Sequence, residues 1–128
     1  MIKAVDLLRK FMFRHFPFFA SADTQDEMWR KDKLTPGLTC EDWISDFSHD
    51  WRRLREKLPF NNKLKEIDAF HDELRKYLEL RLTELHNRNV VTMHRNILDD
   101  RIWKKIQREA KRIALREKIP FYVRTSDY

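Results

Sequence analysis

Residues 99–118 read DDRIWKKIQREAKRIALREK, and the spacing of their apolar and basic side chains predicts one amphipathic helix. At about 100° per residue, apolar side chains gather on one face of that helix and basic side chains on the opposite face. The apolar face comprises Ile102, Ile106, Ala110 and Ile113, with Trp103 and Ala114 at its edge. The sequence therefore predicts a helix that packs on a protein body through one side and presents cations on the other.

The other side of this helix, called the basic face below, contains cations and no carboxylate. Its eight members are Arg101, Lys104, Lys105, Arg108, Lys111, Arg112, Arg116 and Lys118. Even after Glu109 and Glu117 are subtracted, residues 101–118 carry a charge of +6, equal to the net charge of the whole chain. Like charges on one face repel one another and cost stability. We therefore expect the basic face to bind an anionic partner, the alternative being a solvated surface that only keeps the protein soluble. Residues 17–100 are mildly acidic, so we expect the body to neutralise part of this face.

The composition favours an all-α protein. The chain has 128 residues, the length of one domain, with a single glycine and four prolines. Few sharp corners are therefore expected, and 38% charged residues suit helices joined by brief connections. Nine phenylalanines and four tryptophans supply a bulky core. We predict a small bundle of four to five helices.

Two central segments predict an antiparallel helical hairpin. The first, about residues 40–58, begins at a variant capping box from Thr39 to Asp42 and repeats apolar side chains at helical spacing. The second, about residues 62–86, carries the longest regular apolar stripe of the chain. A short corner at Pro59-Phe60 joins them, so they should pack side by side. Residues 87–92 lower the helix propensity and predict a break, although a single helix from Asn62 to Lys118 is the alternative.

The N-terminal block, residues 1–22, is basic and amphipathic, and Pro17 is expected to end its helix. Three interpretations fit this block: a core helix, a mitochondrial targeting helix, or an interfacial helix on an anionic membrane. In the last of these, residues 1–16 contact the membrane and Phe16, Phe18 and Phe19 lie in the headgroup boundary. We divide the chain into this segment, a bundle domain at 23–118 and an aromatic tail at 119–128 that docks in a groove. A short helix at 23–33 and a turn at residues 35–37 complete the outline.

Few residues suggest chemistry. Cys40 is the single cysteine, which excludes an intrachain disulfide, and no apolar run is long enough to span a bilayer. Phosphate-binding glycine loops and the common nucleophile and zinc motifs are absent from the sequence. Residues 46–50 and 68–72 both read D-x-x-H-D, a spacing at which Asp and His can share a helix face toward a metal. However, His71 falls within the apolar stripe of its helix and His49 falls opposite that of its own. The sequence thus predicts a hydrogen-bonded core His71 and a solvated His49, with no metal and no cofactor.

These observations predict a non-enzymatic helical interaction protein, a subunit or assembly factor of a larger complex that contacts an anionic partner through the basic face. The aromatic content supports this reading because aromatic residues are enriched at interfaces. A nucleic-acid module that follows the RNA or DNA backbone is the alternative. A metal-dependent hydrolase built on the D-x-x-H-D segments is the second alternative. The single cysteine fits an intracellular, reducing compartment, mitochondrial or cytoplasmic.

Overall fold

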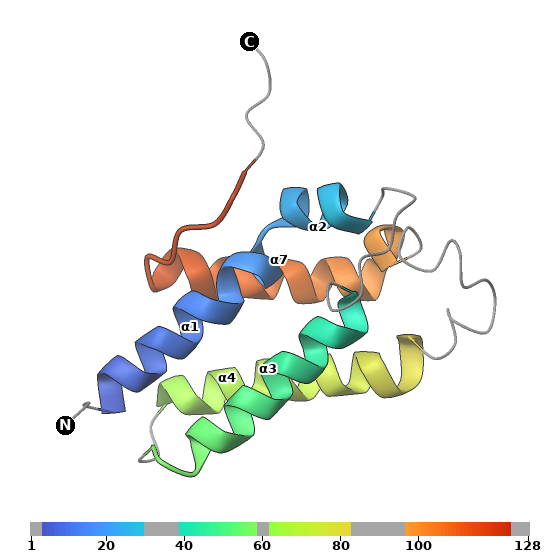
Figure 1. Cartoon of the computed structure of the whole chain (residues 1–128). Coiled ribbons are helices and arrows are strands. Elements are labelled where there is room, and N and C mark those ends of the chain that lie inside the picture. The colour runs from blue at the N-terminus through green and yellow to red at the C-terminus, as the bar shows by residue number, and fades with distance from the viewer. Residues whose placement is uncertain (1–3, 30–38, 59–61, 83–96, 124–128) are drawn as a thin grey trace.

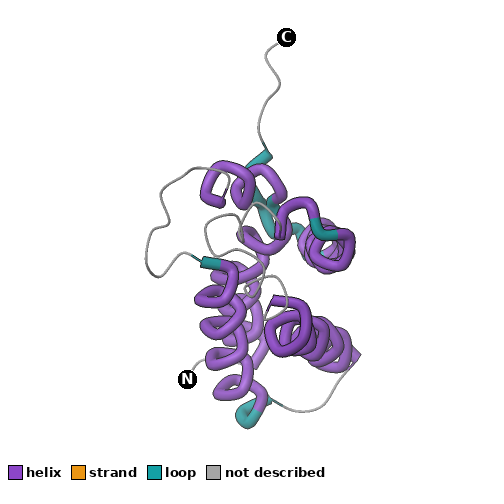
Figure 2. The backbone as a smooth tube through the Cα atoms, turned by 90° about the vertical axis from the view of Figure 1, so that its right-hand side faces the viewer, coloured by secondary structure: helices purple, strands orange, loops and turns teal. Residues whose placement is uncertain are grey.

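The computed structural model of the chain describes residues 4–29, 39–58, 62–82 and 97–123 (Figure 1). Its helices are α1 (Ala4–Ala20), α2 (Ala22–Trp29), α3 (Cys40–Arg55), α4 (Asn62–Lys76), the π-helix η1 (Tyr77–Leu82) and α7 (Arg101–Arg116). Figure 2 shows helices and loops throughout these four ranges and no strand. The predicted all-α bundle is therefore confirmed. The expected turn at 35–37, the corner at 59–60 and the break at 87–92 lie outside the described residues.

Helix α1 is a core element that makes its most extensive contact with α7 and also packs on α3 (Figure 1). Its apolar side chains are buried: Leu8, Phe11, Met12, Phe16, Phe18 and Phe19. This confirms the core-helix interpretation of the N-terminal block. It contradicts the interfacial interpretation as far as Phe16, Phe18 and Phe19 are concerned, because all three rings pack inside the protein. A targeting role for the block stays a prediction.

Pro17 does not end α1, as the sequence analysis expected, but lies inside the helix, which continues to Ala20. A proline within a helix removes one backbone hydrogen bond and crowds the preceding turn. The residues after it compensate, because Phe18, Phe19 and Ala20 are all buried in the core. The burial of two phenylalanine rings is worth several kcal/mol, roughly the cost of the proline. Packing thus overrides the local signal for a helix end.

Gln25 of α2 holds the C-terminal end of α1 to α7. Its side chain is 1% exposed, and its Nε2 atom donates hydrogen bonds of 3.1 Å to the carbonyl oxygens of Phe18 and Phe19. Its Oε1 atom accepts a hydrogen bond of 2.8 Å from Trp103 Nε1. Gln107 of α7 donates a further bond of 2.7 Å to the carbonyl oxygen of Ala20. Carbonyl groups that a helix end leaves without partners are thereby satisfied.

Helices α3 and α4 form the predicted antiparallel hairpin. The capping box is present, since Thr39 Oγ1 accepts from Asp42 N–H at 3.1 Å and the Asp42 carboxylate accepts from Thr39 N–H. Two hydrogen bonds join the helices in antiparallel order, between Ser48 and His71 and, further along α3, between Trp51 and Asp68. Helix α4 gives way to η1 at Tyr77, inside the predicted helix of about 62–86, whose last four residues are not described.

The C-terminal segment after α7 turns back along the bundle, toward α2 (Figure 1). Ile119 is buried, the Tyr122 hydroxyl donates to Glu27 at 3.2 Å, and the carbonyl oxygen of Tyr122 accepts from the Ser21 hydroxyl. The part of the predicted aromatic tail up to residue 123 therefore docks on the body, as expected. Residues 124–128 are not described.

Candidate partner-binding surface

Helix α7 begins and ends close to the predicted bounds of 99 and 118. Asp100 is its N-cap, since one carboxylate oxygen accepts from Ile102 N–H at 3.1 Å and the other accepts from the Tyr77 hydroxyl at 2.9 Å. The helix ends where Lys118 adopts a left-handed backbone with φ of 57°, and Ile119 N–H returns a hydrogen bond of 2.8 Å to Ala114. Tyr77 therefore fixes the start of α7 against η1, and the cations that follow stand on a docked, capped helix.

The buried side of α7 is rotated from the one that the sequence predicts. Trp103, expected at the edge of the apolar face, is 1% exposed, whereas Ile102, expected within that face, is 48% exposed. The reason is Trp103 itself, whose indole reaches into the core to bond Gln25 and contacts Trp29 and Tyr77. Ile106, Ala110, Ile113 and Ala114 are buried as expected. The rotation leaves all eight members of the basic face exposed.

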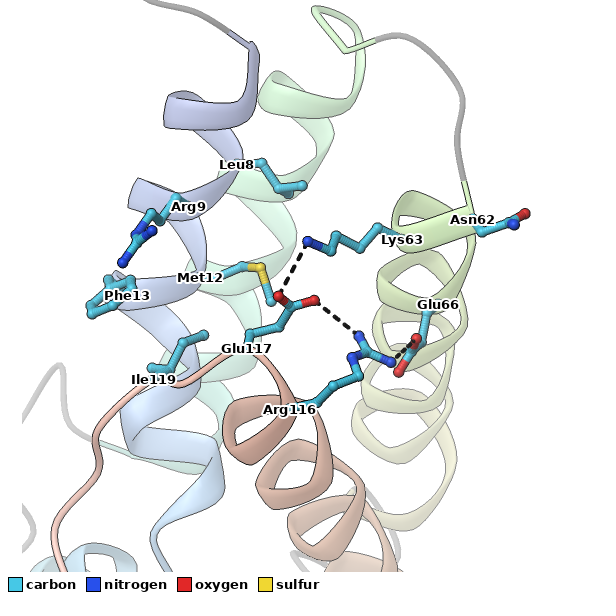
Figure 3. Close-up of a pocket in the computed structure, with 10 residues that line it drawn as sticks. All are labelled: Leu8, Arg9, Met12, Phe13, Asn62, Lys63, Glu66, Arg116, Glu117 and Ile119. Atoms are coloured by element: carbon cyan, nitrogen blue, oxygen red, sulfur yellow. Dashed lines mark hydrogen bonds and ion pairs between the residues drawn. The ribbon is translucent and has the colours of Figure 1, made fainter.

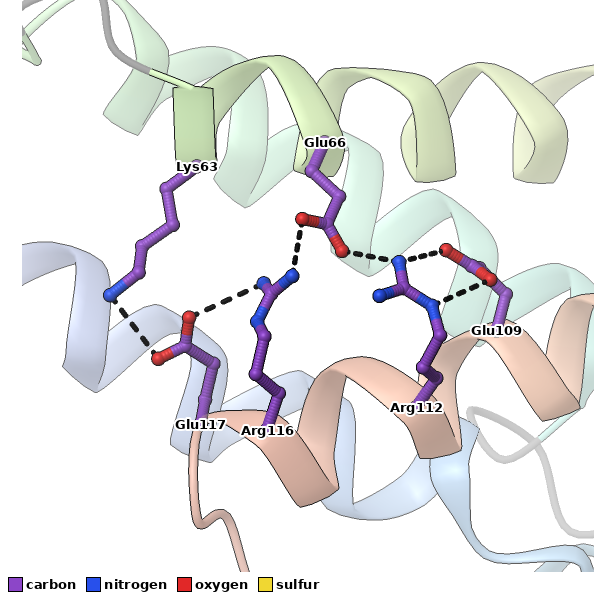
Figure 4. A network of polar contacts seen from close by, with 6 residues as sticks. All are labelled: Lys63, Glu66, Glu109, Arg112, Arg116 and Glu117. Atoms are coloured by element: carbon purple, nitrogen blue, oxygen red, sulfur yellow. Dashed lines mark hydrogen bonds and ion pairs between the residues drawn. The ribbon is translucent and has the colours of Figure 1, made fainter.

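Ion pairs neutralise one edge of the basic face (Figure 4). The carboxylate of Glu66, on α4, accepts from both Arg112 and Arg116, at 2.5 Å each. Glu109 also pairs with Arg112, and Glu117 pairs with Arg116 at 3.3 Å. Neutralisation by the protein body was expected in general, but no spacing in the sequence singles out Glu66, because only the packing of α4 against α7 brings it there.

Glu66 is the centre of this network electrostatically as well. Its partial burial raises the pKa of the carboxyl, but hydrogen bonds from Arg116 and Arg112 outweigh that effect and hold the pKa below its ordinary value. The bonds to Glu109 and Glu66 likewise raise the pKa of Arg112. Near neutral pH these groups are therefore charged and engaged with one another. Arg112 and Arg116, called the paired edge below, are committed to internal contacts.

The remaining six cations of the basic face have no carboxylate within ion-pair distance in the part of the chain that the structure describes. They are Arg101, Lys104, Lys105, Arg108, Lys111 and Lys118. Leu115, 61% exposed, projects among them. The structure thus divides the predicted binding surface into a paired edge and a larger open part, and it brings five of the open cations onto one side of α7, with Lys118 just beyond its C-terminal end.

A pocket of about 670 Å³ lies where α1, α4 and the end of α7 meet (Figure 3). Leu8, Met12 and Phe13 of α1 give it an apolar wall. Across from them, Lys63 and Glu117 form an ion pair at 3.2 Å that continues the network of Glu66 and Arg116. These four charged groups at the pocket are therefore paired with one another.

The two D-x-x-H-D segments serve the packing of the hairpin and of α1. His71 is buried and hydrogen-bonded to Ser48 at 2.7 Å, and burial lowers its pKa. His49 is exposed. The carboxylates have structural partners as well: Asp50 accepts from His15 at 2.7 Å, and Asp68 accepts from the indole of Trp51 at 2.8 Å. The predicted core His71 and solvated His49 are confirmed, and the described ranges hold no cluster of acidic, histidine and cysteine side chains fit to bind a metal.

Cys40 is buried at the start of α3, and burial raises the pKa of its thiol well above the ordinary value. A thiol of that kind is not a reactive nucleophile near neutral pH. Within the four described ranges, none of the helices combines the length and the apolar character needed to cross a bilayer. The described part of the chain thus leaves the basic face as its most distinctive surface.

Comparison with known proteins adds no relative: no protein-family model, no curated protein and no solved structure matches this chain.

Proposed function

We propose that this protein is a non-enzymatic helical interaction protein, a subunit or assembly factor that docks an anionic macromolecular partner on the open part of α7. The observation that carries the proposal is the contrast between two sets of cations on one helix. Arg112 and Arg116 are paired internally, whereas six neighbouring cations are exposed and have no carboxylate partner among the described residues. A surface that only kept the protein soluble would mix charges of both signs.

The cations that remain open are costly to the folded protein by themselves. Five like charges along α7, with Lys118 just past its end, repel one another, and a bound anion removes that repulsion. Exposed ion pairs contribute about 0.2–1 kcal/mol each, so a partner that engaged all six would gain roughly 1–6 kcal/mol from them. Such an interface forms quickly and weakens as salt rises, because screening acts on exposed charges.

Charge reversal on the open part tests the proposal. The variant Lys104→Glu/Arg108→Glu/Lys111→Glu should lose the partner that wild-type protein captures from its native cell, measured by mass spectrometry and by nucleic-acid recovery. The control reverses three exposed cations of α3 and the turn that follows it instead, through Arg52→Glu, Arg53→Glu and Lys57→Glu. This control variant changes the net charge by the same amount but leaves the open cations intact, so it should still capture the partner. Equal capture by both triple variants, with folding verified by circular dichroism, would rule out the proposal.

Glu66 provides a variant with the opposite effect. Glu66→Gln removes the carboxylate that Arg112 and Arg116 share, so binding of the anionic partner should tighten by a few-fold. A nuclease step in the same capture experiment separates the two partner classes. If nuclease releases the partner, and affinity falls with salt at a log–log slope near −4, the nucleic-acid alternative replaces the protein partner.

A further inference from the structure

The open part of α7 contains a straight row with the spacing of a coiled-coil seam. Positions 101, 104, 108, 111 and 115 of the helix follow one another at alternating intervals of three and four residues. This row, called the open row below, reads Arg, Lys, Arg, Lys, Leu. All five side chains are exposed. Between Arg101 and Leu115 it extends about 21 Å along the helix, at the usual rise per residue.

A second helix is the natural occupant of a row with this spacing. Side chains at alternating intervals of three and four residues stay on one line along a helix, so a partner helix that repeats the same intervals can face every one of them. The four cationic positions require carboxylates opposite them, and Leu115 requires an apolar side chain. Leu115 distinguishes this occupant from a nucleic-acid backbone, which has no apolar group to cover a leucine that is 61% exposed.

The open row is the part of the basic face best suited to an acidic partner. On the α4 side, Arg112 and Arg116 are already paired with Glu66, Glu109 and Glu117. On the α2 side, a groove of about 370 Å³ is lined by Lys104 and Arg108 of the row together with Asp23 and Asp26. A partner's carboxylates therefore gain most along the open row, whose cations have no carboxylate within ion-pair distance among the described residues.

We propose that the open row binds an acidic α-helical segment of a partner protein, with carboxylates at intervals of three and four residues and one apolar residue that packs on Leu115. The inference rests on the proposed function, since it names the partner class for the same surface. Ionic contacts speed the association of the two helices, and the leucine contact sets their register.

A synthetic helical peptide as long as α7 provides the probe. It carries glutamate at intervals of three and four residues with one leucine in the row, and a second peptide of identical composition distributes the same glutamates around the helix. Fluorescence anisotropy at low salt measures both against the full chain. The row peptide should bind at least tenfold more tightly than the redistributed one, and single-stranded or duplex RNA should not bind more tightly than the row peptide.

Leu115→Ala isolates the apolar contact. Loss of a buried leucine contact should weaken row-peptide binding by about five- to tenfold. Ile102→Ala is the matched control, because Ile102 is an exposed apolar residue of the same helix that lies off the row, and it should leave binding unchanged.

The outcomes separate this inference from the function on which it rests. Equal binding of the two peptides, tighter binding of RNA, or no effect of Leu115→Ala would overturn the acidic-helix partner. The proposed function would survive those results if Lys104→Glu/Arg108→Glu/Lys111→Glu still lost the captured partner. If that triple variant bound the row peptide as well as wild type and captured the same partner, both proposals would be wrong.

Discussion

Replacing Gln25 by leucine should destabilise the protein strongly, although the two side chains are similar in volume. The substitution removes three hydrogen bonds in the core, from Trp103 and to the carbonyl oxygens of Phe18 and Phe19. The Phe18 oxygen keeps a partner, because Ser21 N–H also donates to it at 3.1 Å. The indole N–H of Trp103 and the carbonyl oxygen of Phe19 lose their hydrogen bonds to the Gln25 side chain.

Each buried polar group left without a hydrogen bond costs about 1–3 kcal/mol, and the added apolar atoms of leucine recover part of that. We therefore expect the free energy of unfolding to fall by about 2–4 kcal/mol. Urea denaturation followed by circular dichroism measures it. Gln107→Leu is the matched control: it removes one hydrogen bond, to Ala20, from a half-buried side chain that water can reach, so it should cost less than about 1 kcal/mol.

A double-mutant cycle isolates the bond between α2 and α7. Trp103→Phe removes the indole donor, so Gln25→Leu in that background should cost about 1–2 kcal/mol less than in the wild type. The reasoning would be refuted by a Gln25→Leu variant within about 0.5 kcal/mol of wild type, or by a coupling energy near zero.

Three further predictions concern single contacts. Burial outweighs the hydrogen bond to Asp50 and lowers the pKa of His15 in the folded protein. As the pH falls below about 6.5, the unfolded chain therefore takes up a proton at this histidine before the folded protein does, and stability should decline. Urea titration across pH should show a less steep decline in His15→Gln than in a His49→Gln control. Thr39→Ala removes the N-cap of α3 and should cost about 0.5–2 kcal/mol by the same assay; no loss would contradict the capping role. Tyr77→Phe deletes the hydroxyl that bonds the α7 N-cap and should cost about 1–2 kcal/mol, with faster amide exchange in the first turn of α7.

The hairpin and α7 were predictable because their signals are local. Thr39 and Asp42 lie three residues apart and cap α3 by themselves, and the stripe of α4 buries the residues that its spacing selects. The basic face was predictable for the same reason, since the angle between neighbours on a helix is fixed.

The differences arise where distant parts of the chain meet. Pro17 was expected to end α1, but rings that pack against other helices extend the helix past it. Ile102 is exposed because a bond from Trp103 to Gln25 rotates α7. The role of Glu66 depends on the packing of α4 against α7, and nothing in its sequence neighbours distinguishes it from other outward glutamates. Each of these facts belongs to the tertiary arrangement, which periodicity does not encode.

The packing of α1 against α7 has a consequence for synthesis of the protein. Helix α1 carries four buried phenylalanines, but α7, with which it makes its most extensive contact, is synthesised only after α2, α3 and α4. Until then the part of α1 that packs on α7 is uncovered, and the contact between the two helices closes a loop that contains α2, α3 and α4. The bundle is therefore completed only after α7 has left the ribosome. A nascent chain stalled before α7 exposes apolar, phenylalanine-rich surface on α1, and chaperones bind surface of this kind.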